Sequence, residues 1–265
     1  MTPARRNDLD EGTLRIEVER RLGARAGAIW FAESTGSTND EAKRAAAAGA
    51  PSRSVFVADA QTAGRGRQGR VWHSPAGANL YLSILLRPEA APAAVAPFAL
   101  VVGLAVAEEV DACFGSSRAR VKWPNDVWIE GRKIAGILLE ASIAGGRVSS
   151  LVVGVGVDVH TESFPEEIAG VATSLAILGA PRRDRAALAA GITARVVDAE
   201  ATFVARGFAP FLEAVRARDA LAGRRVRIDG VTGRAEGVAD DGCLQIRLES
   251  GELSRVVAGH VELLD

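Results

Sequence analysis

A change of pattern near Leu221 constrains the fold of this 265-residue chain more than any other feature of its sequence. Before it, over residues 27–220, segments with the apolar spacing of helices alternate with short runs typical of strands. After it, over residues 221–265, short apolar runs are separated by glycine turns such as Asp241-Gly242 and Ser250-Gly251. Alternating helices and strands favour a layered α/β fold, and short strands joined by such turns favour a small β-barrel. We therefore expect helices covering a sheet, followed by a small barrel domain.

The residue patterns also place the individual elements of the large domain. They predict helices over residues 38–49, 100–114 and 185–203, and strands over 55–59, 79–88 and 151–159. Residues 120–141 are predicted to form a strand, a turn, a second strand, a hairpin and a third strand. Residues 1–26 are polar and too short for a helix-turn-helix module, and we interpret them as a loosely held tail.

Composition and charge exclude several classes of protein. A net charge of -1 provides no general field for gripping nucleic acid or an anionic membrane, so any recognition of anions must be local. Cys113 and Cys243 are too few for a disulfide framework, and neither these cysteines nor the scattered histidines show a metal-ligand spacing. The N-terminus lacks the apolar core of a signal peptide, and no apolar run approaches the roughly 20 residues that span a bilayer. We expect a cytoplasmic protein that binds neither DNA nor membranes.

The segment 64–70, with the sequence GRGRQGR, combines three glycines with three arginines. Glycine lets the backbone approach a ligand closely, and arginine supplies forked donors suited to carboxylate and phosphate. This composition is typical of a lid that closes over an anionic ligand, with Trp72 available to stack on a ring. Composition alone slightly favours a solvated basic loop or an RGG-like contact with nucleic acid. The segment is no Walker A loop, because the chain contains no G-x-x-x-x-G-K-[S/T] pattern.

Two further segments carry side chains suited to ligand binding. Ser37, Thr38 and Asn39 precede the first predicted helix, whose free N–H groups can bind a small polar ligand. Taken alone, this segment favours two capping boxes, Ser37 with Asp40 and Thr38 with Glu41.

The sequence KWPND, residues 122–126, is followed seven residues later by Lys133 and then by Gly136. A lysine can neutralise charge where a carboxylate attacks a phosphate, and Asn125 and Asp126 offer oxygen atoms to Mg²⁺. A simple turn and a solvated lysine explain each of these residues equally well when each is considered separately.

In combination and in this order, these segments resemble the biotin protein ligase family, together with residues 77–83 (GANLYLS) and the K-x-x-G-I-L-x-E run that begins at Lys133. The resemblance extends from about residue 29 to the C-terminus. It implies a mixed sheet flanked by helices, related to class II aminoacyl-tRNA synthetases, and a C-terminal SH3-like β-barrel. The implied domains are a tail over 1–26, a catalytic domain over 27–220 and the SH3-like domain over 221–265.

The resemblance also implies a role for individual side chains. The residues implied to bind biotin are Ser37, Thr38, Asn39, Gln61, Gly64, Arg65, Gly66, Arg67, Lys133 and Gly136. Those implied to serve the nucleotide are Arg70, Trp72, Lys122, Asn125 and Asp158, with Asp126 as a ligand of Mg²⁺. Lys133, Arg67 and Lys122 are the implied catalytic residues. Asp158 departs from the family, which usually has asparagine at this position, so its role does not transfer directly.

The implied reaction joins biotin to ATP as biotinyl-5′-AMP, with release of pyrophosphate, and then transfers biotin to a lysine of the biotin carboxyl carrier protein of acetyl-CoA carboxylase. Because two anions must meet, electrostatic stabilisation by the arginines, Lys133 and Mg²⁺ is the main requirement. A lipoate or octanoate ligase of the same fold is the nearest alternative, and a nucleic-acid-binding protein is a distant one. The oligomeric state is left open, with a homodimer as one arrangement.

Overall fold

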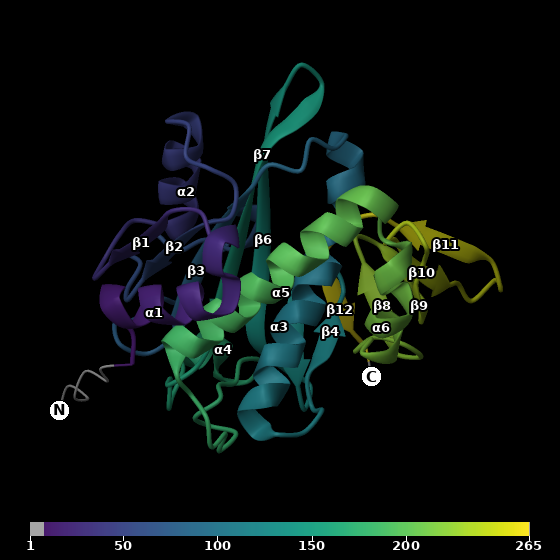
Figure 1. Ribbon diagram of the computed structural model, residues 1–265. Helices are drawn as coiled ribbons and strands as arrows, with labels where there is room; N and C mark the ends of the chain where they lie inside the picture. The colour runs from purple at the N-terminus through teal and green to yellow at the C-terminus, as the bar shows by residue number, and fades with distance from the viewer. Residues whose placement is uncertain (1–7, 265) are drawn as a thin grey trace.

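In the computed structural model, which describes residues 8–264, seven strands form one mixed sheet (Figure 1). The strands are β1 (Ile29–Ala32), β2 (Ser54–Ala58), β3 (Leu80–Leu86), β4 (Arg120–Lys122), β5 (Asp126–Ile129), β6 (Arg132–Ala144) and β7 (Arg147–Val157), in the order β1-β2-β3-β7-β6-β5-β4. β1 and β2 run parallel, and the other neighbouring strands are antiparallel. The predicted mixed sheet and the strands that correspond to β2 to β7 are thereby confirmed, whereas β1 was not predicted.

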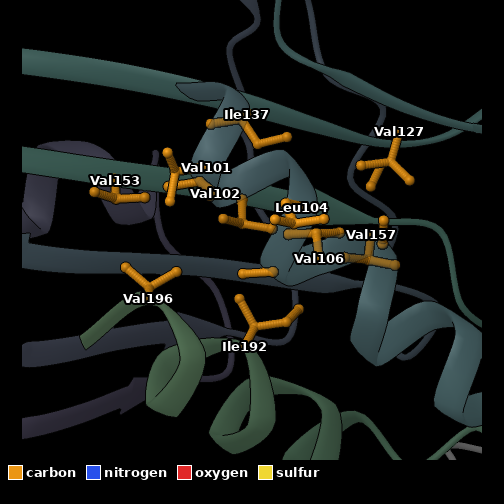
Figure 2. Close-up of a cluster of buried hydrophobic side chains, with 14 of the residues drawn as sticks. Val101, Val102, Leu104, Val106, Val127, Ile137, Val153, Val157, Ile192 and Val196 are labelled. Carbon is orange, nitrogen blue, oxygen red and sulfur yellow. The ribbon is translucent and has the colours of Figure 1, made fainter. Parts of the chain in front are cut away.

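Helices cover both faces of this sheet. α1 (Glu11–Leu22), α3 (Phe98–Phe114) and α5 (Arg185–Arg206) pack together on one face, whereas α2 (Thr38–Ala47) lies on the other. Successive side chains of a strand point to opposite faces of the sheet, so each strand contributes to the apolar layers on both faces. In β2, Val55 and Val57 join the large core, and Phe56 packs with Ala42 of α2. Figure 2 shows apolar side chains from α3, α5 and the sheet meeting in the large core.

α3 lies at the centre of the molecule, between α5 and the sheet (Figure 1). The helical stretch Pro92–Phe114 is long and apolar enough to cross a membrane by length and composition. This stretch is an exception to the expectation that no apolar run approaches the length of a bilayer span. Of the 18-residue window within it that meets this test, 67% is buried inside the protein, which is the pattern of a core helix in a layered α/β domain.

The interpretation of residues 1–26 as a loosely held tail is wrong for the part that the structure describes. α1 buries Leu14, Val18 and Leu22, which recur every four residues along one face, and this face packs against α5. Ahead of the helix, Asp8 accepts hydrogen bonds from the buried Arg185 side chain. Burial and an ion pair therefore hold this segment, and the predicted tail within residues 1–7 lies outside the described residues.

The C-terminal residues form a second, antiparallel sheet, which we call the C-terminal barrel. Its strands are β8 (Arg225–Ile228), β9 (Val231–Val238), β10 (Leu244–Arg247), β11 (Leu253–Val256) and β12 (Val261–Leu263). The predicted turns at 241–242 and 250–251 join β9 to β10 and β10 to β11. The short helices α4 (Glu166–Ala169) and α6 (Leu212–Ala217) lie in the connections that precede the barrel.

The barrel is docked against the catalytic sheet by specific hydrogen bonds. Trp123, 2% exposed, donates from its indole nitrogen to the carbonyl of Gly242 at 3.0 Å. The chain at Asp219 pairs with Val121 at the end of the sheet. One wall of the cavity described below therefore comes from the C-terminal barrel.

Candidate functional site

A cavity opens on the α2 face of the sheet, where side chains along β6 and β7 become small. Val152 of β7 packs against α2, but Gly154 and Gly156, which follow on the same face, carry no side chain. Gly136 of β6, paired with Gly156, leaves the same space empty. Glycines in a strand interior indicate close approach of another group, and here they give the cavity its floor.

Lys133 reaches this cavity because of a bulge in β6. The register between β5 and β6 shifts: Trp128 faces Lys133, but the preceding Val127 faces Ala135, so Ile134 is the extra residue. Without the bulge, Lys133 and Gly136 would lie on opposite faces of the sheet, because they are three residues apart. With it, both line the same cavity.

One end of the cavity is lined by neutral polar side chains at the start of α2. Ser37, Thr38 and Asn39 are all buried here. Thr38 donates its backbone N–H to the Gln61 side-chain oxygen at 2.9 Å, and its hydroxyl lies 3.2 Å from the same atom.

The two predicted capping boxes are wrong. Ser37 makes no side-chain hydrogen bond to the helix, and the carboxylate of Glu41 accepts from the Thr35 hydroxyl at 2.5 Å. Gln61, 23 residues away from Thr38, takes over the cap that a local side chain would otherwise provide.

Asn39 is held rigidly at the same end. Its amide oxygen accepts from the buried Ser83 hydroxyl at 2.5 Å, and its amide nitrogen donates to Glu140 at 2.7 Å. Burial opposes ionisation of Glu140, but hydrogen bonds from Lys43 and Asn39 outweigh it and lower the pKa of that carboxyl. A methyl group added at Gly154 would lie 2.4 Å from the Asn39 side-chain oxygen, so this glycine makes room for the amide.

The segment Gly64–Arg70, which we call the arginine loop, is folded as a small hairpin over the cavity. Arg65 pairs with Val71 across the hairpin, and Gly66 donates its backbone N–H to the Arg70 carbonyl at 2.7 Å. Gly64 is buried against Ser74, where an added methyl group would lie 2.5 Å from the Ser74 hydroxyl oxygen. Gly64 therefore serves close packing at the base of the loop and is absent from the cavity lining.

The arginines of this loop have different partners. Arg65 forms a two-pronged ion pair with Asp40 of α2 at 2.5 and 2.7 Å, and lies 3.5 Å from Glu140. The bidentate hydrogen bond from Arg65 holds the pKa of the Asp40 carboxyl well below its usual range. Arg67 instead donates to the side-chain oxygen of Asn125 at 3.2 Å, and burial lowers its pKa. Arg65 thus ties the loop to α2, while Arg67 ties it to the turn after β4.

Trp72 follows the arginine loop and lies directly on the glycine floor. Methyl groups added at Gly156 and Gly136 would lie 2.5 and 3.0 Å from its indole ring. The Lys133 ammonium is 5.1 Å from the ring centroid, within the range of a cation–π contact. The buried indole nitrogen has no hydrogen-bond partner within residues 8–264, so a donor is available inside the site.

The other end of the cavity is cationic. Arg67, Arg70, Lys122 and Lys133 all line it. Lys122 is 7% exposed and 4.7 Å from the ring centre of Trp128, and burial lowers its pKa. Gathering four basic side chains around one cavity favours anionic ligands, since burial weakens the screening of their charge by water.

Asp158 lies just beyond β7 on the wall of this cavity. It is 5% exposed, and burial raises the pKa of its carboxyl well above the usual value, against the opposing charge of Lys133. Burial thus favours the protonated form of this carboxyl, which can donate a hydrogen bond as an asparagine amide can.

The oxygen ligands proposed for Mg²⁺ already have partners. Asp126 forms an ion pair with Lys133 at 2.6 Å, and the side-chain oxygen of Asn125 accepts from Arg67. Across the described residues, no group of three or more histidine, cysteine, aspartate or glutamate side chains is positioned to hold a metal. This donor set does not fit a magnesium site built by the protein itself, because an ion at Asp126 would first have to displace an ammonium group.

The structure brings the sequence-predicted site residues together, with Gly64 as the exception. Residues that sequence reasoning missed also line the cavity, among them Tyr81, Gly154, Gly156, Phe164 and His260. The glycine alternation in β7 was a readable signal for the floor. Nothing local in the sequence marks His260, because it reaches the cavity only through the docking of the barrel.

Comparison with known proteins places this geometry in context. The model of the biotin/lipoate A/B protein ligase family matches residues 9–158, and that of the biotin protein ligase C-terminal domain matches residues 222–264. A solved biotin protein ligase from Aquifex aeolicus, in complex with biotin and ATP, is similar with a TM-score of 0.77 and 29% identity. The similarity covers 89% of this chain and 98% of that structure.

Two curated relatives extend the comparison along the chain. A biotin–[acetyl-CoA-carboxylase] ligase of Mycobacterium tuberculosis is 37% identical over 274 residues, which cover 97% of this chain and 96% of the relative. A bifunctional ligase/repressor BirA of Bacillus spizizenii is 32% identical over 233 residues, covering 86% of this chain and 71% of the relative.

Proposed function

This chain belongs to the biotin/lipoate A/B protein ligase family and is a biotin protein ligase, and from this we propose how its own residues divide the reaction. The enzyme uses ATP to convert biotin into biotinyl-5′-AMP and transfers the biotin to a protein. The match to the biotin ligase C-terminal domain favours biotin over lipoate as the acid. We propose a carrier domain of acetyl-CoA carboxylase as the acceptor, as named for the mycobacterial relative.

One observation supports this assignment of residues to biotin and to ATP. A single cavity has a neutral polar end and a cationic end, with Lys133 and Trp72 between them. Biotin has an uncharged ureido ring at one end and a carboxylate at the other. The ring suits the side chains of Ser37, Thr38 and Asn39, which offer donors and acceptors without charge. The carboxylate then points toward Lys133 and the phosphates of ATP.

The reaction brings two anions together, since the biotin carboxylate attacks the α-phosphorus of ATP. Lys133 would keep its ion pair with Asp126 and direct its remaining N–H donors to the reacting oxygens. Arg67, Arg70 and Lys122 would stabilise the charge that builds up on the phosphates as pyrophosphate leaves. A requirement for magnesium remains a prediction, and within residues 8–264 no group of acidic side chains is positioned to hold the ion.

The product of the first step is a mixed anhydride that water would hydrolyse. The arginine loop covers the cavity and is fastened on two sides, to Asp40 by Arg65 and to Asn125 by Arg67. We propose that these two contacts keep the loop closed until a carrier lysine arrives, so that the adenylate is shielded from water.

The absence of DNA binding and a homodimeric state remain predictions.

Mass spectrometry tests the proposed function directly. The purified chain, biotin and MgATP are incubated with a carrier domain of acetyl-CoA carboxylase, and we expect one biotinyl group on its acceptor lysine. The same mixture with lipoate in place of biotin is the control and should leave the carrier unmodified. Modification by lipoate alone would overturn the assignment of biotin as substrate.

A further inference from the structure

The second half of the reaction poses a chemical problem that the residues discussed so far do not solve. A lysine side chain is an ammonium ion at neutral pH, and it cannot attack the adenylate until it has lost a proton. Arg67, Arg70, Lys122 and Lys133 line the cavity, but they carry positive charge and cannot accept it. Two histidines, His73 and His260, also line the cavity. Asp126 is occupied by Lys133 at 2.6 Å, and Asp158 is buried on the inner wall.

Resting on the proposed ligase function, we propose that His260 of the C-terminal barrel accepts the proton of the attacking carrier lysine. Its side chain lines the catalytic cavity, although the residue lies in a different domain from the residues implied to bind biotin and ATP. It also remains exposed to solvent. A proton acceptor for an incoming protein needs both properties, because it must be reached from outside and must return its proton to water.

The backbone around His260 is held in place on both sides. A methyl group added at Gly259 would lie 2.4 Å from Ile228 and 2.7 Å from the Asp229 carboxylate, so this glycine fits tightly against the turn after β8. On the other side, Val261 pairs with Ile228 in the barrel. The Val261 carbonyl also accepts from the Lys122 ammonium at 3.4 Å, across the domain boundary. The position of His260 relative to the catalytic sheet is therefore set by the docking of the barrel.

Burial and nearby cations favour the neutral form of the His260 ring. Burial of part of the ring lowers its pKa, and the cations Arg70 and Lys122 lower it further, while Asp126 and Asp229 act in the opposite direction. Arg70 comes from the arginine loop, Lys122 from β4, Asp126 from β5 and Asp229 from the barrel turn. Because these effects together lower the pKa of the imidazole, they favour the unprotonated ring, which can act as a base.

The transfer step balances with this assignment. The carrier ammonium gives one proton to the imidazole, and the free amine forms a C–N bond at the biotinyl carbonyl. The bond between that carbon and the phosphate oxygen then breaks, and AMP leaves with the electron pair. The second proton of the new amide nitrogen passes to AMP or water, and the imidazolium releases its proton to solvent.

Single-turnover measurements on His260→Gln test this assignment. The rate of biotin transfer from bound adenylate to the carrier domain is divided by the rate of biotin-dependent pyrophosphate release. General base catalysis contributes about 10²–10⁴-fold, and we expect this ratio to fall at least tenfold. Glu262→Gln, a neighbouring change at an exposed ion pair on β12, is the matched control and should keep the wild-type ratio.

Hydroxylamine distinguishes a base from a structural role, because this nucleophile is already unprotonated at neutral pH. His260→Gln should therefore release the biotinyl group to hydroxylamine at the wild-type rate. With the carrier lysine, transfer by the wild type should level off above about pH 7, as neutral imidazole becomes fully populated. In the variant it should keep rising with pH, because water and hydroxide must then remove the proton.

The outcomes separate this inference from the proposed function. No biotin-dependent pyrophosphate release by the wild type would mean that the ligase function itself is wrong. An unchanged ratio in His260→Gln, or an equal fall in transfer to lysine and to hydroxylamine, would overturn the role of His260. A fall in the ratio only in His73→Gln, the other histidine lining the cavity in the described part of the chain, would overturn it as well.

Discussion

Gly154 of β7 lies directly beneath the Asn39 side chain, and replacing it by alanine tests how tightly the polar end of the cavity is built. The new methyl group would lie 2.4 Å from the Asn39 oxygen and 2.9 Å from its amide nitrogen. Both distances are shorter than any real contact, so the amide must turn away. Turning breaks its hydrogen bonds with Ser83 at 2.5 Å and with Glu140 at 2.7 Å.

The magnitude follows from these two hydrogen bonds. Each buried bond contributes roughly 1 kcal/mol, so their loss costs about 2 kcal/mol and displaces a side chain proposed to contact biotin. If the lost hydrogen bonds weaken biotin binding by this free energy, the KM for biotin rises about 30-fold at saturating ATP. If the loss instead lowers the free energy of unfolding by the same amount, the melting temperature should fall by about 4–8 °C for a chain of this size.

Pyrophosphate release at varied biotin and calorimetric melting measure the two effects. Gly170→Ala is the control, because an added methyl group there meets no atom within 4 Å. Asn39→Ala in the Gly154→Ala background removes the crowded amide, and we expect it to regain part of the melting temperature without regaining biotin affinity. A single Gly154→Ala variant with wild-type KM and melting temperature would show that Asn39 does not pack on this glycine.

Three other changes probe the rest of the site and the fold. Lys133→Ala should lower the rate of adenylation at least 100-fold, because its charge is proposed to face the reacting carboxylate; near-normal pyrophosphate release would contradict this role. Arg67→Gly should shorten the lifetime of bound biotinyl-AMP about tenfold, since the arginine loop loses its contact with Asn125. An unchanged lifetime in a filter-retention assay would refute the proposal that this contact keeps the loop closed. At Asp8, burial raises the carboxyl pKa, but hydrogen bonds from His160 and Arg185 outweigh it and lower the value to about 2. Its folded pKa lies below the unfolded value, so its roughly 2 kcal/mol of stability should be present above about pH 4 and lost as pH falls toward 2. Urea unfolding should therefore show Asp8→Asn destabilised about twice as much at pH 6 as at pH 3, whereas an equal deficit at both would disprove the linkage.

Local patterns in the sequence were sufficient for the fold class. The predicted strands form one sheet covered on both sides because alternation along β2 and β3 supplies two apolar faces, one for the large core and one for α2. The same reasoning placed α3 and α5 within a few residues of their observed bounds. These features depend on periodicity over ten or so residues, which can be read from the chain alone.

The N-terminal segment shows where this kind of reasoning stops. Leu14, Val18 and Leu22 have helical spacing, but so short a stripe is stable only when another helix covers it. That cover is α5, more than 150 residues later, and the ion pair of Asp8 with Arg185 joins the same distant parts. A pattern within 26 residues contains no information about such partners.

In the candidate site, too, the sequence indicates which residues take part but not which partners they have. The combination of the motif segments, through its resemblance to the biotin protein ligase family, identified residues that the structure gathers around one cavity, whereas each segment taken alone was explained as well by a helix cap, a turn or a solvated loop. What those residues do to one another was decided by tertiary structure. Gln61 caps α2 in place of the nearby Glu41, and a bulge of a single residue turns Lys133 toward the cavity.

The sequence by itself therefore determined the layered α/β domain, the small C-terminal barrel and the set of residue types available for chemistry. Only the tertiary structure decided that Arg65 is tied to Asp40 and that His260 of the barrel joins the cavity. The physical reason is that spacing along the chain sets which face a side chain occupies. Its partner, and with it the pKa and the hydrogen bonds, depends on segments that meet only when the sheet, the helices and the barrel pack together.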